Sequence, residues 1–157
     1  MIKFMLDSNI FDELAAYCCV TQRLKMLVKN NKVSLYYTHI QKAQISHNNV
    51  PEAKKKQFEH LCNELDVKEL KTTGALLSKQ NSIPLATFPL KFSDCKSYDS
   101  IRGNKKGYKE AEDAAIAQTA ADCQLDYIVT IDSIFNRNLK PPKIDFQEFK
   151  RVVEGIE

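Results

Sequence analysis

Three aspartates stand at positions where carboxylates could act together on a phosphate. Asp7 follows the apolar segment 2–6, Asp132 follows the segment 127–130, and Asp113 opens the helical stretch 114–123. In an open α/β sheet, ligands bind outside the carboxyl ends of the strands. Carboxylates at such positions suit Mg²⁺ or Mn²⁺, which prefer oxygen ligands. The sequence therefore points to metal-dependent chemistry on phosphates.

Phosphodiester hydrolysis gives such a constellation a specific task. The reaction needs a nucleophilic water and stabilisation of charge on the attacked phosphate, and one or two divalent ions supply both. Neighbouring carboxylates raise each other's pKa unless a cation neutralises them. Three converging aspartates would therefore be costly without a metal ion.

Each aspartate also has a purely structural explanation. Asp7 could cap the first helix, and Asp132 could cap a turn over 133–138, because Asp is a common N-cap residue. Asp113 lies near the start of its helix, where the helix dipole favours an acid regardless of function. Their combined placement at the ends of separate elements favours the metal-binding interpretation.

The elements that must position these side chains alternate between strand and helix. Thr21 and Thr38 are expected to cap the helices that follow them. The pattern predicts an α/β fold with a central parallel sheet and right-handed crossovers. Strands are predicted over 2–6, 33–37, 126–130 and 143–146, and helices over 9–20, 22–29, 39–46, 51–65, 109–123 and 147–153.

The length of 157 residues predicts a single domain spanning 1–157. The segment 81–107 contains two prolines and two glycines and lacks clear periodicity, so it is expected to form an irregular loop insertion. Such loops often carry function.

The bulk composition excludes a membrane span and favours a cytoplasmic protein. No apolar run approaches the roughly 20 residues of a transmembrane helix, and the N-terminal apolar segment is too short for a signal-peptide core. The five cysteines show no CxxC or Cys/His cluster, so zinc is disfavoured. Adjacent Cys18 and Cys19 fall in a helical pattern and are interpreted as small core residues.

Three segments resemble the PIN-domain family of metal-dependent ribonucleases, which includes the toxins of many toxin–antitoxin pairs. Residues 5–9 (MLDSN) resemble the opening strand with its Asp-Ser/Thr-Asn motif. Residues 112–120 (EDAAIAQTA) resemble the helix in which Asp precedes an Ile-Ala-x-x-Ala run. Residues 127–135 (YIVTIDSIF) resemble the strand ending in Thr-x-Asp with a following Phe.

The resemblance implies a three-layer α/β/α fold around an acidic pocket. Asp7, Asp113 and Asp132 would hold Mg²⁺ or Mn²⁺ directly or through water. Thr130 and Asn9 would lie in the same pocket, with Thr130 orienting Asp132 or a water. The implied reaction is endonucleolytic cleavage of RNA. An antitoxin protein and a second copy of the chain are expected partners.

The chain departs from the family pattern at Gln44, where the family usually has a Glu. An amide oxygen carries no charge and is a weaker Mg²⁺ ligand. Glu110 lies three residues before Asp113, shares its helix face and is the preferred substitute. Glu112 should point about 100° away from Asp113 on an ideal helix.

The departure leaves three interpretations open: a nuclease that works with fewer acids, a catalytically inactive RNA- or protein-binding module, and an engineered inactive form. An α/β phosphohydrolase acting on small molecules is a further, less favoured possibility. The net charge is +3. One basic cluster directly precedes Asp113 and could bind RNA phosphates, although solvated lysines are common on any soluble protein. Its members are Arg102, Lys105, Lys106 and Lys109.

Overall fold

A computed structural model of the chain describes residues 1–72, 108–133 and 140–157, with side chains from residue 112 onward in the second range. The elements are β1 (Ile2–Leu6), α1 (Ile10–Ala16), α2 (Cys18–Lys29), β2 (Val33–Thr38), α3 (His39–Ser46), α4 (Glu52–Glu64), β3 (Lys68–Leu70), α6 (Tyr108–Asp122), β4 (Tyr127–Val129), β5 (Lys143–Ile144) and α7 (Phe146–Glu154).

The described strands form one parallel sheet in the order β3-β2-β1-β4-β5. β1 is central: Phe4 pairs with Leu35 of β2 on one side and with Tyr127 of β4 on the other. The chain adds β2 and β3 on one side of β1 and then adds β4 and β5 on the other. The carboxyl ends of β1 and β4 therefore flank the point at which the strand order reverses, where open α/β sheets commonly bind ligands.

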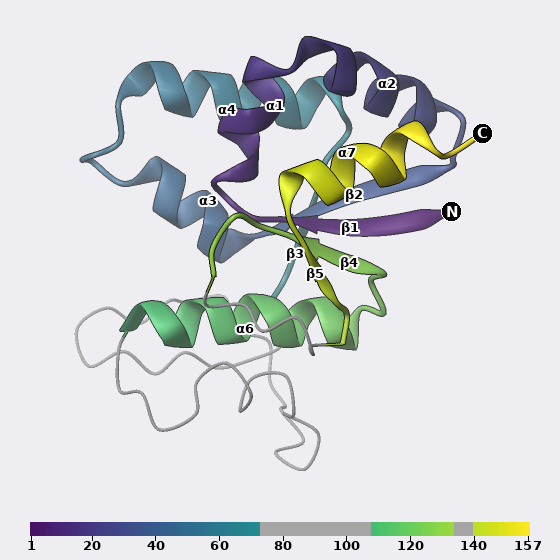
Figure 1. The fold of residues 1–157 in the computed structure, drawn as a ribbon. Helices are drawn as coiled ribbons and strands as arrows, with labels where there is room; N and C mark the ends of the chain where they lie inside the picture. The colour runs from purple at the N-terminus through teal and green to yellow at the C-terminus, as the bar shows by residue number, and fades with distance from the viewer. Residues whose placement is uncertain (73–107, 134–139) are drawn as a thin grey trace.

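Helices cover both faces of the sheet and complete three layers. α1, α2, α4 and α7 lie on one face, and α6 lies on the other (Figure 1). Alternate residues of β1 serve the two faces: Phe4 and Leu6 join the core on the four-helix face, whereas Met5 packs with the α6 face. The predicted α/β/α architecture with a parallel sheet is confirmed.

Most predicted elements match within one or two residues, but the first helical region divides differently. The helix breaks at Tyr17 rather than near Thr21. Thr21 lies inside α2, where its hydroxyl donates to the carbonyl oxygen of Leu14 at 2.7 Å. The predicted capping role of Thr21 is therefore wrong.

The interpretation of Cys18 and Cys19 as core residues is also wrong, because both are exposed at the start of α2. The break at Tyr17 changes the helical phase, so the stripe predicted for one continuous helix does not extend through them. α2 instead buries Val20, Leu24 and Leu27.

Two further sequence-based expectations concern the rest of the chain. The loop insertion 81–107 lies outside the described residues. Among the described residues, no helix combines the length and the apolar character needed to cross a membrane.

Candidate functional site

Asp7 lies at the carboxyl end of the central strand, almost fully buried with 6% of its surface exposed. Its backbone N–H donates to the carbonyl oxygen of Val129 at 3.0 Å, which continues the β1–β4 pairing to this residue. Its carboxylate oxygen Oδ1 accepts from the backbone N–H of Ser8 at 2.7 Å and from the Ser8 hydroxyl at 3.4 Å. The side chain is thus oriented by the residue that follows it.

Thr130 connects the ends of the two strands. Its hydroxyl donates to Asp7 Oδ2 at 2.5 Å and accepts from the backbone N–H of Asp132 at 3.0 Å. Asn9 Nδ2 donates to Asp7 Oδ2 at 2.9 Å and to the Thr130 hydroxyl at 3.3 Å. The structure therefore brings together Asp7, Asn9 and Thr130, as predicted, and adds Ser8. We call these four residues the Asp7 network.

The capping explanation for Asp7 does not match these contacts. The N-cap residue of α1 is Asn9, which makes no side-chain capping hydrogen bond. The carboxylate of Asp7 instead accepts from Ser8, Asn9 and the Thr130 hydroxyl. Its partners thus include a neighbouring strand end as well as the start of α1.

The pKa of Asp7 is raised above its ordinary value, chiefly because burial disfavours the charged form. The hydrogen bonds from Thr130 and Ser8 oppose this rise, and the negative charge of Asp132 adds to it. Asp132 is therefore close enough to interact electrostatically with Asp7. Its backbone carbonyl accepts from Lys143 Nζ at 2.6 Å, which ties the segment after β4 to β5.

Asp113 is buried on α6 with 5% of its surface exposed. α6 begins at Tyr108, so Asp113 is its sixth residue and lies beyond the first turn, where helix-dipole stabilisation is concentrated. Helix-dipole stabilisation therefore does not explain why an acid stands at position 113. A carboxylate this far into a helix and this deeply buried needs another source of stabilisation.

A divalent cation such as Mg²⁺ needs oxygen ligands held close together. Among the described residues, which include Asp7, Asp113 and Asp132, no three His, Cys, Asp or Glu side chains form a metal-binding group, so the predicted convergence of the three aspartates is not found. Mg²⁺ is nevertheless commonly bound by one or two carboxylates together with waters and substrate phosphates. Asp7 and Asp132 are two carboxylates at the ends of neighbouring strands, and the charge of Asp132 acts on Asp7. The long 3.4 Å contact from the Ser8 hydroxyl is the one that a cation could displace from Asp7 most easily.

Gln44 of α3 contacts an acidic residue of α6. Its Nε2 donates to Glu112 Oε2 at 2.8 Å, which links α3 to α6. Glu112 is adjacent in sequence to Asp113. The sequence-based prediction concerned only the direction of Glu112 relative to Asp113 on one helix. The contact between Glu112 and Gln44 of α3 was not predicted. The preferred substitute Glu110 lies in α6, but its side chain is outside the described residues.

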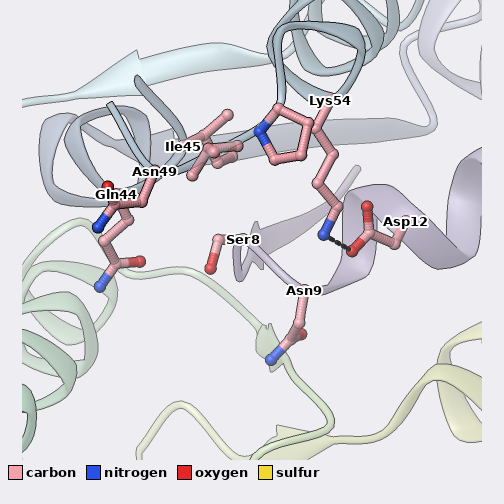
Figure 2. Close-up of a pocket in the computed structure, with 9 residues that line it drawn as sticks. Ser8, Asn9, Asp12, Gln44, Ile45, Asn49 and Lys54 are labelled. Carbon is pink, nitrogen blue, oxygen red and sulfur yellow. Dashed lines mark hydrogen bonds and ion pairs between the residues drawn. The ribbon is translucent and has the colours of Figure 1, made fainter. Parts of the chain in front are cut away.

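A pocket of about 320 Å³ adjoins the Asp7 network. Ser8 and Asn9 form one wall, and residues of α3 and of the α3–α4 connection form the opposite wall (Figure 2). Lys54 and Asp12 also line the pocket, and Lys54 Nζ lies 2.5 Å from Asp12 Oδ2 (Figure 2). The remaining lining residues are Gln44, Ile45, Asn49, Val50 and Pro51. Of the residues in this wall, sequence reasoning had singled out Gln44; it missed the others because they form no recognisable motif.

The predicted RNA-binding cluster falls outside this description. Arg102, Lys105 and Lys106 lie outside the described residues. Lys109 belongs to α6, but its side chain also lies outside them.

Comparisons with known proteins bear on the fold. A scan against models of protein families found no match, and neither did a search of curated proteins. Among solved structures, the chain is similar to the crystal structure of PAE2754 from Pyrobaculum aerophilum, with a TM-score of 0.51 and 15% sequence identity. The alignment covers 98% of this chain and 97% of that chain. At this identity the likeness shows a shared fold over nearly the full length.

Proposed function

We propose that this chain is a Mg²⁺- or Mn²⁺-dependent endoribonuclease of the PIN type. The observation that carries the proposal is the buried Asp7 carboxylate at the end of the central strand, bonded to Thr130 and electrostatically coupled to Asp132. An acid whose ionised form is disfavoured by burial and by a like charge is a recognised feature of functional sites. A cation at this position would remove both penalties.

The chain's own residues would orient the ligands of such a cation. Thr130 and Asn9 fix Oδ2 of Asp7, and the Thr130 hydroxyl also fixes the backbone of Asp132. The bound ion would polarise the phosphate and activate the attacking water. Asp113 of α6, the helix that covers the other face of the sheet, is not grouped with these two carboxylates in the described structure, so it would contribute through a bound water.

RNA is the substrate class supported by the surroundings of this site. The adjoining pocket combines amides with apolar surface, which suits an unstacked base of a single strand. The resemblance at residues 5–9, 112–120 and 127–135 implies the same substrate.

The direct test is cleavage of a mixed single-stranded RNA pool with Mn²⁺ and with a chelator. We expect wild type to cut only with the metal ion. Asp113→Ala should reduce the rate on the order of 10²–10³-fold, as expected for loss of a group that stabilises developing charge. Asp122→Ala is the matched control, because Asp122 is an exposed aspartate of the same helix. Calorimetry with Mn²⁺ provides a readout that does not depend on turnover.

Two results would overturn the proposal. The first is the absence of metal-stimulated cleavage by folded wild-type protein. The second is undiminished cleavage by Asp113→Ala. RNA binding without cleavage would support the alternative of a binding module. Activity that appears only in Gln44→Glu would identify the wild-type chain as an inactive member of the family.

A further inference from the structure

The pocket beside the Asp7 network is suited to a neutral, planar ligand. Ile45, Val50 and Pro51 provide apolar surface, and amide side chains provide hydrogen-bonding groups. Its cation, Lys54, is already paired with Asp12 at 2.5 Å, so the pocket offers little net positive charge to an anion. Its volume lies at the lower end of the range for small-molecule sites.

The orientation of the Gln44 amide is determined by its neighbour. An ionised carboxylate accepts hydrogen bonds and donates none. The NH₂ group of Gln44 must therefore face Glu112, to which it donates at 2.8 Å. The amide oxygen Oε1 is then the end of Gln44 that can accept from a ligand. Because Gln44 lines the pocket, the pocket wall carries an acceptor of fixed polarity.

The geometry points to a nucleobase subsite, and we propose that it selects bases with an exocyclic amino group. Such an amino group would donate to Gln44 Oε1 while the ring packs against Ile45 and Pro51. At the position of the cytosine amino group, uracil presents a carbonyl oxygen that would face Gln44 Oε1 with like polarity; its hydrogen-bond donor is the ring N3–H at the adjacent position. The proposal extends the nuclease function above by defining the class of nucleotide that lies next to the cleaved phosphate.

The location of the pocket supports this role. Ser8 and Asn9 belong both to the pocket wall and to the Asp7 network. A base in the pocket would therefore lie beside the carboxylate proposed to act on the phosphodiester. On this interpretation Gln44 recognises the base by accepting a hydrogen bond from it. Glu112 is a positioning residue that acts by orienting the Gln44 amide.

The test uses free nucleosides, which carry no phosphate and need no metal ion. Cytidine and uridine form one matched pair, and adenosine and inosine form another, because in each pair a carbonyl replaces the amino group and the adjacent ring nitrogen becomes an N–H donor. Side-chain amide signals of Gln44 and Asn49 would be followed by NMR in a metal-free buffer. We expect uridine and inosine to bind roughly tenfold more weakly than their amino partners, the effect of losing one hydrogen bond.

Glu112→Gln separates a positioning role from simple packing. A glutamine at 112 can accept or donate, so the Gln44 amide becomes free to reverse and present its NH₂ group. We expect this variant to bind uridine about as well as cytidine. Gln44→Leu should also lose the preference. Glu59→Gln on α4 is the control, because Glu59 is exposed and does not line the pocket.

The outcomes distinguish this inference from the nuclease proposal. A preference for amino-bearing nucleosides that disappears in Glu112→Gln supports the subsite, whether or not the protein cleaves RNA. Equal binding of the matched pairs by wild type would overturn it, as would an unchanged preference in Glu112→Gln. Failure of millimolar nucleosides to shift the Gln44 signals would also overturn it, even if metal-dependent cleavage is observed.

Discussion

The two faces of the sheet are built from side chains of different size. The face covered by α1, α2, α4 and α7 holds large aromatic rings that pack edge to face. The ring centroids are 4.9 Å apart in the pair Phe4–Phe149 and 4.6 Å apart in the pair Phe11–Phe58. The buried cluster on the α6 face contains no aromatic side chain among the described residues and combines four alanines of α6 with larger aliphatic side chains: Ala114, Ala115, Ala117 and Ala120 pack with Met5, Ile40, Ile116, Leu125 and Ile128. Small side chains occupy little of the space between helix and sheet, so the position of α6 is sensitive to any added volume.

This difference separates two tasks. The four-helix face provides most of the large buried apolar side chains and hence most of the hydrophobic stabilisation. The α6 face carries Asp113 and Glu112 toward the carboxyl end of the sheet, where the candidate site lies. Substitutions on the first face should change stability most, and substitutions on the second should change the site most.

The largest expected loss of stability is for Phe149→Ala. Phe149 is fully buried and packs edge-to-face on Phe4. Removing its ring should lower the free energy of unfolding by about 3–5 kcal/mol, measured by urea denaturation. The folded fraction should retain its nucleoside preference. A loss of that preference in folded protein would contradict the separation of the two faces.

A smaller loss of stability, with a larger effect on the site, is expected for Ala117→Leu. Ala117 is fully buried on α6, and overpacking there should cost about 1–3 kcal/mol. Displacement of α6 should also weaken Mn²⁺ binding, measured by calorimetry. Ala121→Leu is the control, because Ala121 is only partly buried on the same helix. Equal effects of the two variants on Mn²⁺ binding would contradict the prediction.

The smallest effect concerns charge in the site. The charge of Asp132 raises the pKa of Asp7, so Asp132→Asn should lower it, measured by carboxyl NMR titration in a chelator. A raised pKa in the folded state means that the folded protein retains its proton longer than the unfolded chain does. Stability therefore falls as pH rises from the unfolded pKa through the folded pKa, and this fall should be smaller in the variant.

Asp66→Asn provides the comparison for that titration, because Asp66 is exposed and lies outside the Asp7 network. It should leave the pKa of Asp7 unchanged. An Asp7 titration that is identical in wild type and Asp132→Asn would show that the two carboxylates are not coupled.

The sequence was sufficient to predict the elements that carry the three aspartates. β1 and β4 are apolar and rich in β-branched or aromatic residues, and α6 has a continuous helical pattern. The contact between Asp7 and Thr130 could be expected because parallel strands end at the same edge of a sheet. β3 was missed because its sequence Lys-Glu-Leu is short, largely exposed and lies at the edge of the sheet, so burial leaves no alternating pattern.

Contacts between elements that are distant in sequence were harder to predict. The link between Gln44 and Glu112 depends on the relative placement of α3 and α6, which no periodicity within either helix specifies. The pocket wall formed by α3 and the α3–α4 connection was hard to predict for the same reason, because it depends on where these segments lie relative to the end of β1. Such features depend on tertiary packing.

The central position of β1 has a consequence for synthesis of the protein. Asp7 is synthesised well before its partner Thr130, because 123 residues separate the two along the chain. Pairing of β4 with β1 must wait until the chain has been made through β4, because contacts across large sequence separations form late. The Asp7 network is therefore incomplete in any nascent chain that ends before β4. If the proposed activity is correct, it can begin only after Thr130 has been synthesised and β4 has paired with β1.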